Sequence, residues 1–265
     1  MTISERKELL DAWLETSQNV IMMVGAESQL EAIELSEYTS QKVDSNSNMI
    51  GTAVMPSSFF KPSTTEELLN FIKPIAAASY PLPIKYYHVP TMTNVNLDMV
   101  DFITKAIDQI PNFSGIKFTN NDLFTMRRCV NIAAKAEKGE IFFGVDEILI
   151  AGLSMGAKSA VGSTYNFMGP TAHDIHDKFM AGDVLNAIEN NDKIVNTVDA
   201  WSQLGLEGIP AQKAIMKMSG IDLGNVRSPL TDLSEEQYSD LKEALDDIGF
   251  FGFQMVWVLF AKNRE

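Results

Sequence analysis

The chain has 265 residues, of which 45% are hydrophobic and 21% charged, values that fit one large globular domain with a sizeable core. Its 35 acidic residues outnumber 21 basic ones, and the formal net charge of -14 argues against a nucleic-acid partner. The sequence has no apolar run long enough to span a membrane and no signal-peptide pattern, and its one cysteine cannot form an internal disulfide, so we expect a cytoplasmic protein.

Apolar runs alternate with helical periodicity along the first 163 residues. In chain order we predict strands at 19–24, 49–55, 84–89, 115–119, 141–144 and 158–163. Between them we predict helices at 28–43, from 63, at 96–110, at 121–136 and, as a short helix, at 146–154. A further helix, from residue 2, precedes the first strand. Leu30, Ile33 and Tyr38 are expected near the inner face of the second helix, and Pro74 is expected to kink or end the third. After Pro170 the pattern is helical almost throughout.

The predicted strands are apolar along their whole length, which is typical of a parallel sheet covered by helices. Strand ends with polar residues recur about every thirty residues, as on the functional face of a barrel. The chain opens on a helix, and its first strand is too apolar for a solvated sheet edge. Both features predict that material preceding Met1 is absent from this sequence.

Lys117 lies in Gly115-Ile116-Lys117-Phe118-Thr119, a predicted buried strand. Burial disfavours the charged ammonium, and a neutral amine can attack a ketone to form a Schiff base. Taken alone, Lys117 could instead be a strand-end lysine whose ammonium reaches solvent. His173 and His176 could share one helix face, but no third ligand accompanies them, so no metal site is predicted.

Four segments together resemble the N-acetylneuraminate lyases, pyruvate-dependent class I aldolases of the dihydrodipicolinate synthase superfamily. They are Tyr87-His88-Val89-Pro90, Gly115-Ile116-Lys117-Phe118-Thr119, Gly144-Val145-Asp146-Glu147 and Gly162-Ser163-Thr164-Tyr165-Asn166. The resemblance runs from about Thr2 to at least Phe251 in the family's order and spacing.

The resemblance implies an α/β fold, a (β/α)₈ TIM barrel with extra C-terminal helices, assembled as a homotetramer. It implies reversible retro-aldol cleavage of N-acetylneuraminate, a sialic acid, to pyruvate and N-acetylmannosamine. The reaction would use a covalent Schiff base on Lys117 and neither a metal nor another cofactor. Tyr87 would shuttle a proton beside Lys117. The residues implied to hold the substrate's hydroxyl chain are Thr119, Gly144, Asp146, Glu147 and Ser163.

The sequence departs from the family in two places. The Gly-(Ser/Thr)-Thr-Gly-Glu turn that binds the substrate carboxylate in the family is absent, so we expect that the first two βα units of the barrel are missing. The expected domain is a single partial barrel over residues 1–265, with a helical extension from about residue 171. Ser57-Ser58-Phe59-Phe60 stands where some relatives carry a tyrosine pair that reaches across a subunit interface.

Two alternative functions stay open. The chain could be a catalytically impaired, N-terminally truncated homologue. It could also be another pyruvate-dependent aldolase, although the stretch Pro90-Thr91-Met92-Thr93-Asn94 lacks the arginine with which dihydrodipicolinate synthases bind a dicarboxylate.

Overall fold

The structure is a computed structural model that describes residues 1–16, 19–25, 28–43 and 48–254. The chain divides into two compact units. The first comprises Met1–Gly144 with Met155–Ala160, and the second comprises Val145–Ser154 with the chain from Val161 onward. Among the described residues, no helix is both long and apolar enough to cross a membrane.

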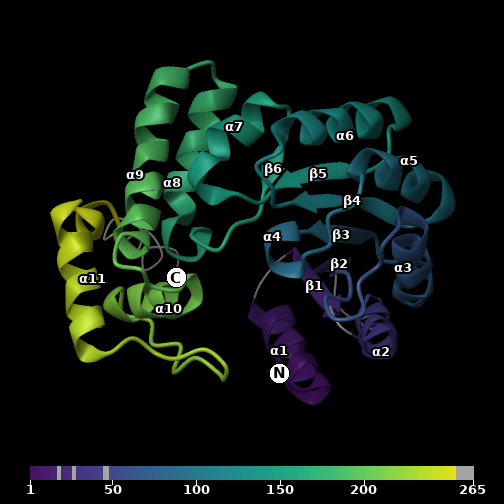
Figure 1. The fold of residues 1–265 in the computed structure, drawn as a ribbon, viewed down its shortest axis with the longest axis horizontal. Coiled ribbons are helices and arrows are strands. Elements are labelled where there is room, and N and C mark those ends of the chain that lie inside the picture. The colour runs from purple at the N-terminus through teal and green to yellow at the C-terminus, as the bar shows by residue number, and fades with distance from the viewer. Residues whose placement is uncertain (17–18, 26–27, 44–47, 255–265) are drawn as a thin grey trace. The chain divides into compact units, whose positions relative to one another are not determined.

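The first unit is built around one sheet of six strands, all parallel and paired in chain order (Figure 1). The strands are β1 (Val20–Gly25), β2 (Met49–Val54), β3 (Ile84–His88), β4 (Phe113–Phe118), β5 (Glu140–Phe143) and β6 (Ser159–Ala160). The helices of this unit are α1 (Ile3–Thr16), α2 (Gln29–Ser40), α3 (Thr65–Ser79), α4 (Pro90–Thr93), α5 (Met99–Gln109) and α6 (Leu123–Ala136). The predicted six parallel strands covered by helices are confirmed, whereas closure into eight βα units stays a prediction.

Short polar side chains begin the helices that follow four successive strands. Ser28, Thr64, Asp98 and Asp122 each accept a hydrogen bond from a backbone N–H in the first turn of α2, α3, α5 and α6, respectively. These N–H groups have no partner within the helix, so each cap stabilises its helix by about 1 kcal/mol. Neighbouring helices in this series pack against one another and form a continuous layer beside the sheet (Figure 1).

Three local predictions were wrong or too long. Of the two outcomes expected at Pro74, a kink or the end of the helix, the end is contradicted, because helix α3 continues to Ser79. Helix α2 buries Ala32 and Leu35, whereas Leu30 is 77% exposed. Strand β6 pairs only over Ser159–Ala160, much less than the expected 158–163. The local pattern alone therefore did not set the boundary or the buried face at these places.

Strand β3 presents different residues on its two faces. Tyr86 and His88 are buried on the face that packs on helices, where the Tyr86 ring lies 4.8 Å from that of Phe102 in α5. Tyr87 is half-buried and lies on the opposite face, since side chains alternate along a strand. The expectation that Tyr86 and His88 point away from Tyr87 is therefore confirmed.

His88 makes the stability of the fold depend on pH. The side chain is 2% exposed, and its Nδ1 has no hydrogen-bond partner among the residues that the structure describes. Burial lowers the pKa of His88 to about 4, against a smaller opposing attraction from Asp122. In the unfolded chain the imidazole takes up its proton near pH 6.5. The folded state cannot do so until about pH 4, so stability falls as the pH drops between these values.

We expect this single group to account for about 3 kcal/mol of lost stability across that window. His88→Gln, which cannot titrate, should remove this component. Urea unfolding of both proteins from pH 7 to pH 4 measures it, because the other titrating groups are common to the two chains. Parallel stability curves for the two proteins would contradict the assignment.

The second unit is helical. It contains the 3₁₀ turn η1 (Asp146–Ile148) and helices α7 (Leu149–Ser154), α8 (Tyr165–Met180), α9 (Val184–Ser202), α10 (Gly208–Met218) and α11 (Glu235–Asp247). Its buried apolar side chains include Phe167 and Ile175 of α8, Ile194 of α9, Leu241 of α11, and Phe250, which follows α11. The expected short helix at 146–154 and the helical C-terminal part are confirmed up to residue 254, while 255–265 lie outside the described residues. The division into one domain with an extension from about residue 171 stays a prediction.

Candidate functional site

Lys117 and Tyr87 lie side by side on neighbouring strands. They are register partners of β4 and β3, so both side chains project from the same face of the sheet. The Lys117 Nζ lies 3.9 Å from the centre of the Tyr87 ring, and both residues are half-buried. The two residues that the resemblance pairs therefore lie side by side, with the lysine amine over the tyrosine ring.

Thr119 and Gly144 lie next to this pair. The Thr119 Oγ1 is buried and has no hydrogen-bond partner within the described part of the chain. A Cβ built on Gly144 would lie 2.0 Å from that oxygen and 3.2 Å from the Lys117 Cε. The missing side chain of Gly144 therefore lets Thr119 and Lys117 pack close to its backbone, and four of the predicted site residues come together in the first unit.

This close approach predicts that Gly144→Ala is destabilising. The new methyl group must displace Thr119, and overpacking of this kind costs about 1–3 kcal/mol. Urea unfolding should show that loss, and the double variant Thr119→Ala/Gly144→Ala should recover part of it. Gly169→Ala is the matched control, because a Cβ there meets nothing within 4 Å. Equal effects at Gly144 and Gly169 would contradict the steric explanation.

Asp146 and Ser163 lie in the second unit and are both engaged by the protein. Asp146 is 6% exposed, and its Oδ2 accepts hydrogen bonds from the Thr164 N (2.8 Å) and Oγ1 (2.7 Å). A Cβ on Gly162 would lie 1.9 Å from the Asp146 Oδ1, so the glycine permits this approach. The exposed Ser163 accepts a hydrogen bond at its Oγ from the Gln212 Nε2 (3.0 Å).

Glu147 differs from its neighbour Asp146. Its side chain is half-buried, and among the described residues its carboxylate has no hydrogen-bond or ion-pair partner. Of the two carboxylates, Glu147 is therefore the one whose oxygens are both available to a ligand. Charged acceptors of this kind form the stronger hydrogen bonds with hydroxyl groups.

Sequence reasoning missed Tyr165 as a possible site residue. Burial raises the pKa of its phenol, and the nearby carboxylates of Asp146 and Glu147 raise it further. The hydroxyl consequently stays protonated, and so stays a hydrogen-bond donor, at neutral pH. Tyr165 lies in the Gly162–Asn166 segment, one of the four that resemble the family. The local sequence did not indicate that its phenol lies near Asp146 and Glu147, which come 19 and 18 residues earlier in the chain.

A second lysine, Lys85, lies on the same face of β3 as Tyr87 and was also missed. Its Nζ donates to the Ser114 carbonyl oxygen (3.2 Å) and lies 4.2 Å from the centre of the Phe142 ring. Burial lowers the pKa of Lys85, and attraction from Glu140 opposes that shift. Lys85 is thus a competing candidate amine.

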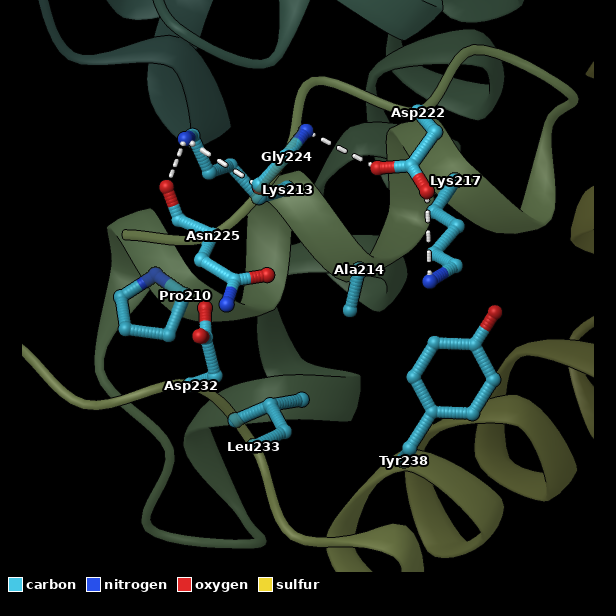
Figure 2. A pocket seen from close by; sticks show the side chains of 10 residues that line it. All are labelled: Pro210, Lys213, Ala214, Lys217, Asp222, Gly224, Asn225, Asp232, Leu233 and Tyr238. Carbon is cyan, nitrogen blue, oxygen red and sulfur yellow. Dashed lines mark hydrogen bonds and ion pairs between the residues drawn. The ribbon is translucent and has the colours of Figure 1, made fainter. Parts of the chain in front are cut away.

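The second unit also contains a polar pocket that none of the predicted site residues lines (Figure 2). Its two lysines are already engaged: Lys217 forms an ion pair with Asp222 (3.3 Å), and Lys213 donates to three backbone carbonyl oxygens of the 223–225 loop. This pocket consequently offers no free cation to a ligand. Over the described part of the chain, there is no group of three or more side chains that could hold a metal ion.

Comparison with known proteins identifies the family. The model of the dihydrodipicolinate synthetase family matches residues 1–248. The N-acetylneuraminate lyase of Homo sapiens is 34% identical over 258 residues, which cover 96% of this chain and 78% of that protein. The Gallus gallus N-acetylneuraminate lyase is 35% identical over 253 residues, which cover 94% and 80%.

Solved structures agree with the sequence matches. The N-acetylneuraminate lyase of Proteus mirabilis has a TM-score of 0.84 and 32% identity, with 94% of this chain and 82% of that chain covered. The Aliivibrio salmonicida N-acetylneuraminate lyase also has a TM-score of 0.84, with 33% identity and coverage of 94% and 81%. Together with the six parallel strands, these matches establish a TIM-barrel-type α/β fold. The chain therefore belongs to the dihydrodipicolinate synthetase family.

Proposed function

We propose that this protein is an N-acetylneuraminate lyase that works as a class I aldolase, cleaving N-acetylneuraminate reversibly to pyruvate and N-acetylmannosamine. The observation that carries the proposal is the Lys117 amine held 3.9 Å from the Tyr87 ring, in a chain whose similar relatives are lyases of this name. This pair combines a nucleophile with a proton carrier, as Schiff-base chemistry requires.

In the proposed reaction the Lys117 Nζ attacks the C2 ketone of the open-chain sugar, and the carbinolamine loses water to give a protonated imine. Electrons of the breaking C–C bond flow into that imine, so cleavage leaves an enamine and an aldehyde. Protonation and hydrolysis of the enamine then release pyruvate. The Tyr87 phenol carries protons between the carbinolamine and the hydroxyl that becomes the aldehyde. The imine itself polarises the substrate, so the proposed steps need no metal and no further cofactor.

The remaining predicted residues are proposed to bind the substrate's hydroxyl chain. Thr119 and Gly144 flank Lys117, while Asp146, Glu147 and Ser163 follow β5 and β6 in the chain. Glu147 is the best placed of these to accept hydroxyl hydrogen bonds, because its carboxylate is unpartnered among the described residues. A homotetramer and a cytoplasmic location, both expected from sequence, stay predictions. Light scattering during size-exclusion chromatography measures the oligomeric state.

A two-stage experiment tests the function. The purified chain is first incubated with pyruvate and borohydride, and the modified residue is located by peptide mass spectrometry. Release of pyruvate from N-acetylneuraminate is then followed with lactate dehydrogenase and NADH. Trapping with cleavage is the expected result. Trapping without cleavage would favour another pyruvate-dependent aldolase, and absence of both would indicate an inactive homologue.

A further inference from the structure

The turn that carries Glu147 is held from a helix that lies far away in the sequence. Asn191 of α9 is only 7% exposed, and its Nδ2 donates to the Glu147 carbonyl oxygen at 2.7 Å. Its Oδ1 accepts a hydrogen bond from the Ile150 N at 3.4 Å. One amide side chain therefore bridges the end of η1 and the start of α7, and so restrains the backbone on both sides of the turn.

The two acidic residues of this turn are restrained by different groups. Asp146 is held through its own carboxylate by Thr164, with bonds of 2.8 and 2.7 Å. Glu147 is held only through its backbone, and its carboxylate has no partner among the described residues. The Asn191 amide therefore restrains where the Glu147 carboxylate can lie, because it fixes the backbone of that residue. It does not compete for the carboxylate oxygens, since it binds only the carbonyl oxygen.

We propose that Asn191 is a positioning residue for Glu147, and that it sets affinity for the polyhydroxylated aldehyde half of the substrate but not for pyruvate. The inference rests on the proposed function. A buried amide fits this role because losing its donor leaves the Glu147 carbonyl oxygen unsatisfied, which shifts the turn. Lys117 and Tyr87 lie on β4 and β3 of the first unit, so we expect Schiff-base formation with pyruvate to be independent of this turn.

The test uses Asn191→Asp, which keeps the size of the side chain and its acceptor but cannot donate to Glu147. Asn191→Leu removes both hydrogen bonds without adding charge. Asn196→Asp is the matched control, because it makes the same chemical change at an exposed position of the same helix. For each full-length protein, the KM for N-acetylmannosamine and the KM for pyruvate are measured in the condensation direction, alongside borohydride trapping with pyruvate.

We expect KM for N-acetylmannosamine to rise about tenfold in both Asn191 variants. KM for pyruvate and the extent of trapping should stay at the wild-type values, and Asn196→Asp should match wild type throughout. Combining Asn191→Asp with Glu147→Gln should raise KM for N-acetylmannosamine by less than the product of the single effects, because the two residues act as one unit.

Several outcomes would overturn the inference. An unchanged KM for N-acetylmannosamine in either Asn191 variant does so directly. Equal losses for both substrates, multiplicative effects with Glu147→Gln, or failure of both Asn191 variants to fold would assign the amide a purely structural role. If the wild-type protein is not trapped by pyruvate and borohydride, the proposed function is wrong. Normal trapping with an unchanged KM for N-acetylmannosamine in the Asn191 variants would contradict only the role of Asn191.

Discussion

Lys117→Arg is expected to abolish cleavage of N-acetylneuraminate, lowering kcat by more than about 10⁴-fold. Arginine keeps the positive charge and much of the length of the side chain, but its guanidinium stays protonated and cannot act as the nucleophile. The same variant should lose covalent trapping by pyruvate and borohydride. Lactate-dehydrogenase-coupled kinetics and intact-protein mass spectrometry measure the two effects.

Lys85→Arg is the matched control, because Lys85 is a second half-buried lysine on this face of the sheet, and burial lowers its pKa. We expect this variant to be trapped at Lys117 as readily as the wild type. The Lys85 amine donates to Ser114 and lies over Phe142, contacts that an arginine can preserve. A borohydride-stable adduct on Lys85, or full activity in Lys117→Arg, would show that the nucleophile has been assigned to the wrong lysine.

Tyr87→Phe is expected to lower kcat by about 10²–10⁴-fold, the range typical of a lost general acid–base group. The substitution keeps the ring that lies 3.9 Å from the Lys117 Nζ, so the lysine should stay in place while the hydroxyl proposed to carry the proton is lost. KM should change much less than kcat, since the proposed role of the phenol is in the chemical steps. Steady-state kinetics in the cleavage direction separate the two parameters.

The neighbouring tyrosine supplies the control for this variant. Tyr86→Phe makes the same change one residue earlier, on the buried face of β3 that packs on α5. It should leave kcat at the wild-type value. Loss of activity in Tyr86→Phe with full activity in Tyr87→Phe would mean that the catalytic face of the strand has been assigned wrongly.

Much of the first unit could be predicted from local pattern alone. A strand buried on both faces must be apolar along its length, and a helix needs a polar cap where its first N–H groups lack partners. These requirements act within a few residues, so the six strands and most helix starts can be predicted from the sequence. The pairing of Lys117 with Tyr87 came from the resemblance to the family, and the register of the parallel strands β3 and β4 places the two residues side by side.

Predictions failed where the outcome depends on a partner from elsewhere in the chain. Helix α2 carries apolar residues on more than one side, and its packing on β1 and α3 selected Ala32 and Leu35 over Leu30. Helix α3 retains its helical path through Pro74 because the surrounding contacts outweigh one missing hydrogen bond. The local sequence does not indicate which face of a helix a neighbouring element will bury, or whether its contacts will let the helix continue through a proline.

The sequence by itself determined the parallel α/β pattern, the nucleophile candidate and the acidic pair after β5. Only the tertiary structure decided how the two acidic residues differ: Thr164 engages the carboxylate of Asp146, while Asn191 holds the backbone of Glu147. The physical reason is the range of the interactions. Hydrophobic periodicity and capping act over a few residues, whereas these hydrogen bonds join groups separated by 18 and 44 positions, which only the folded chain brings within reach.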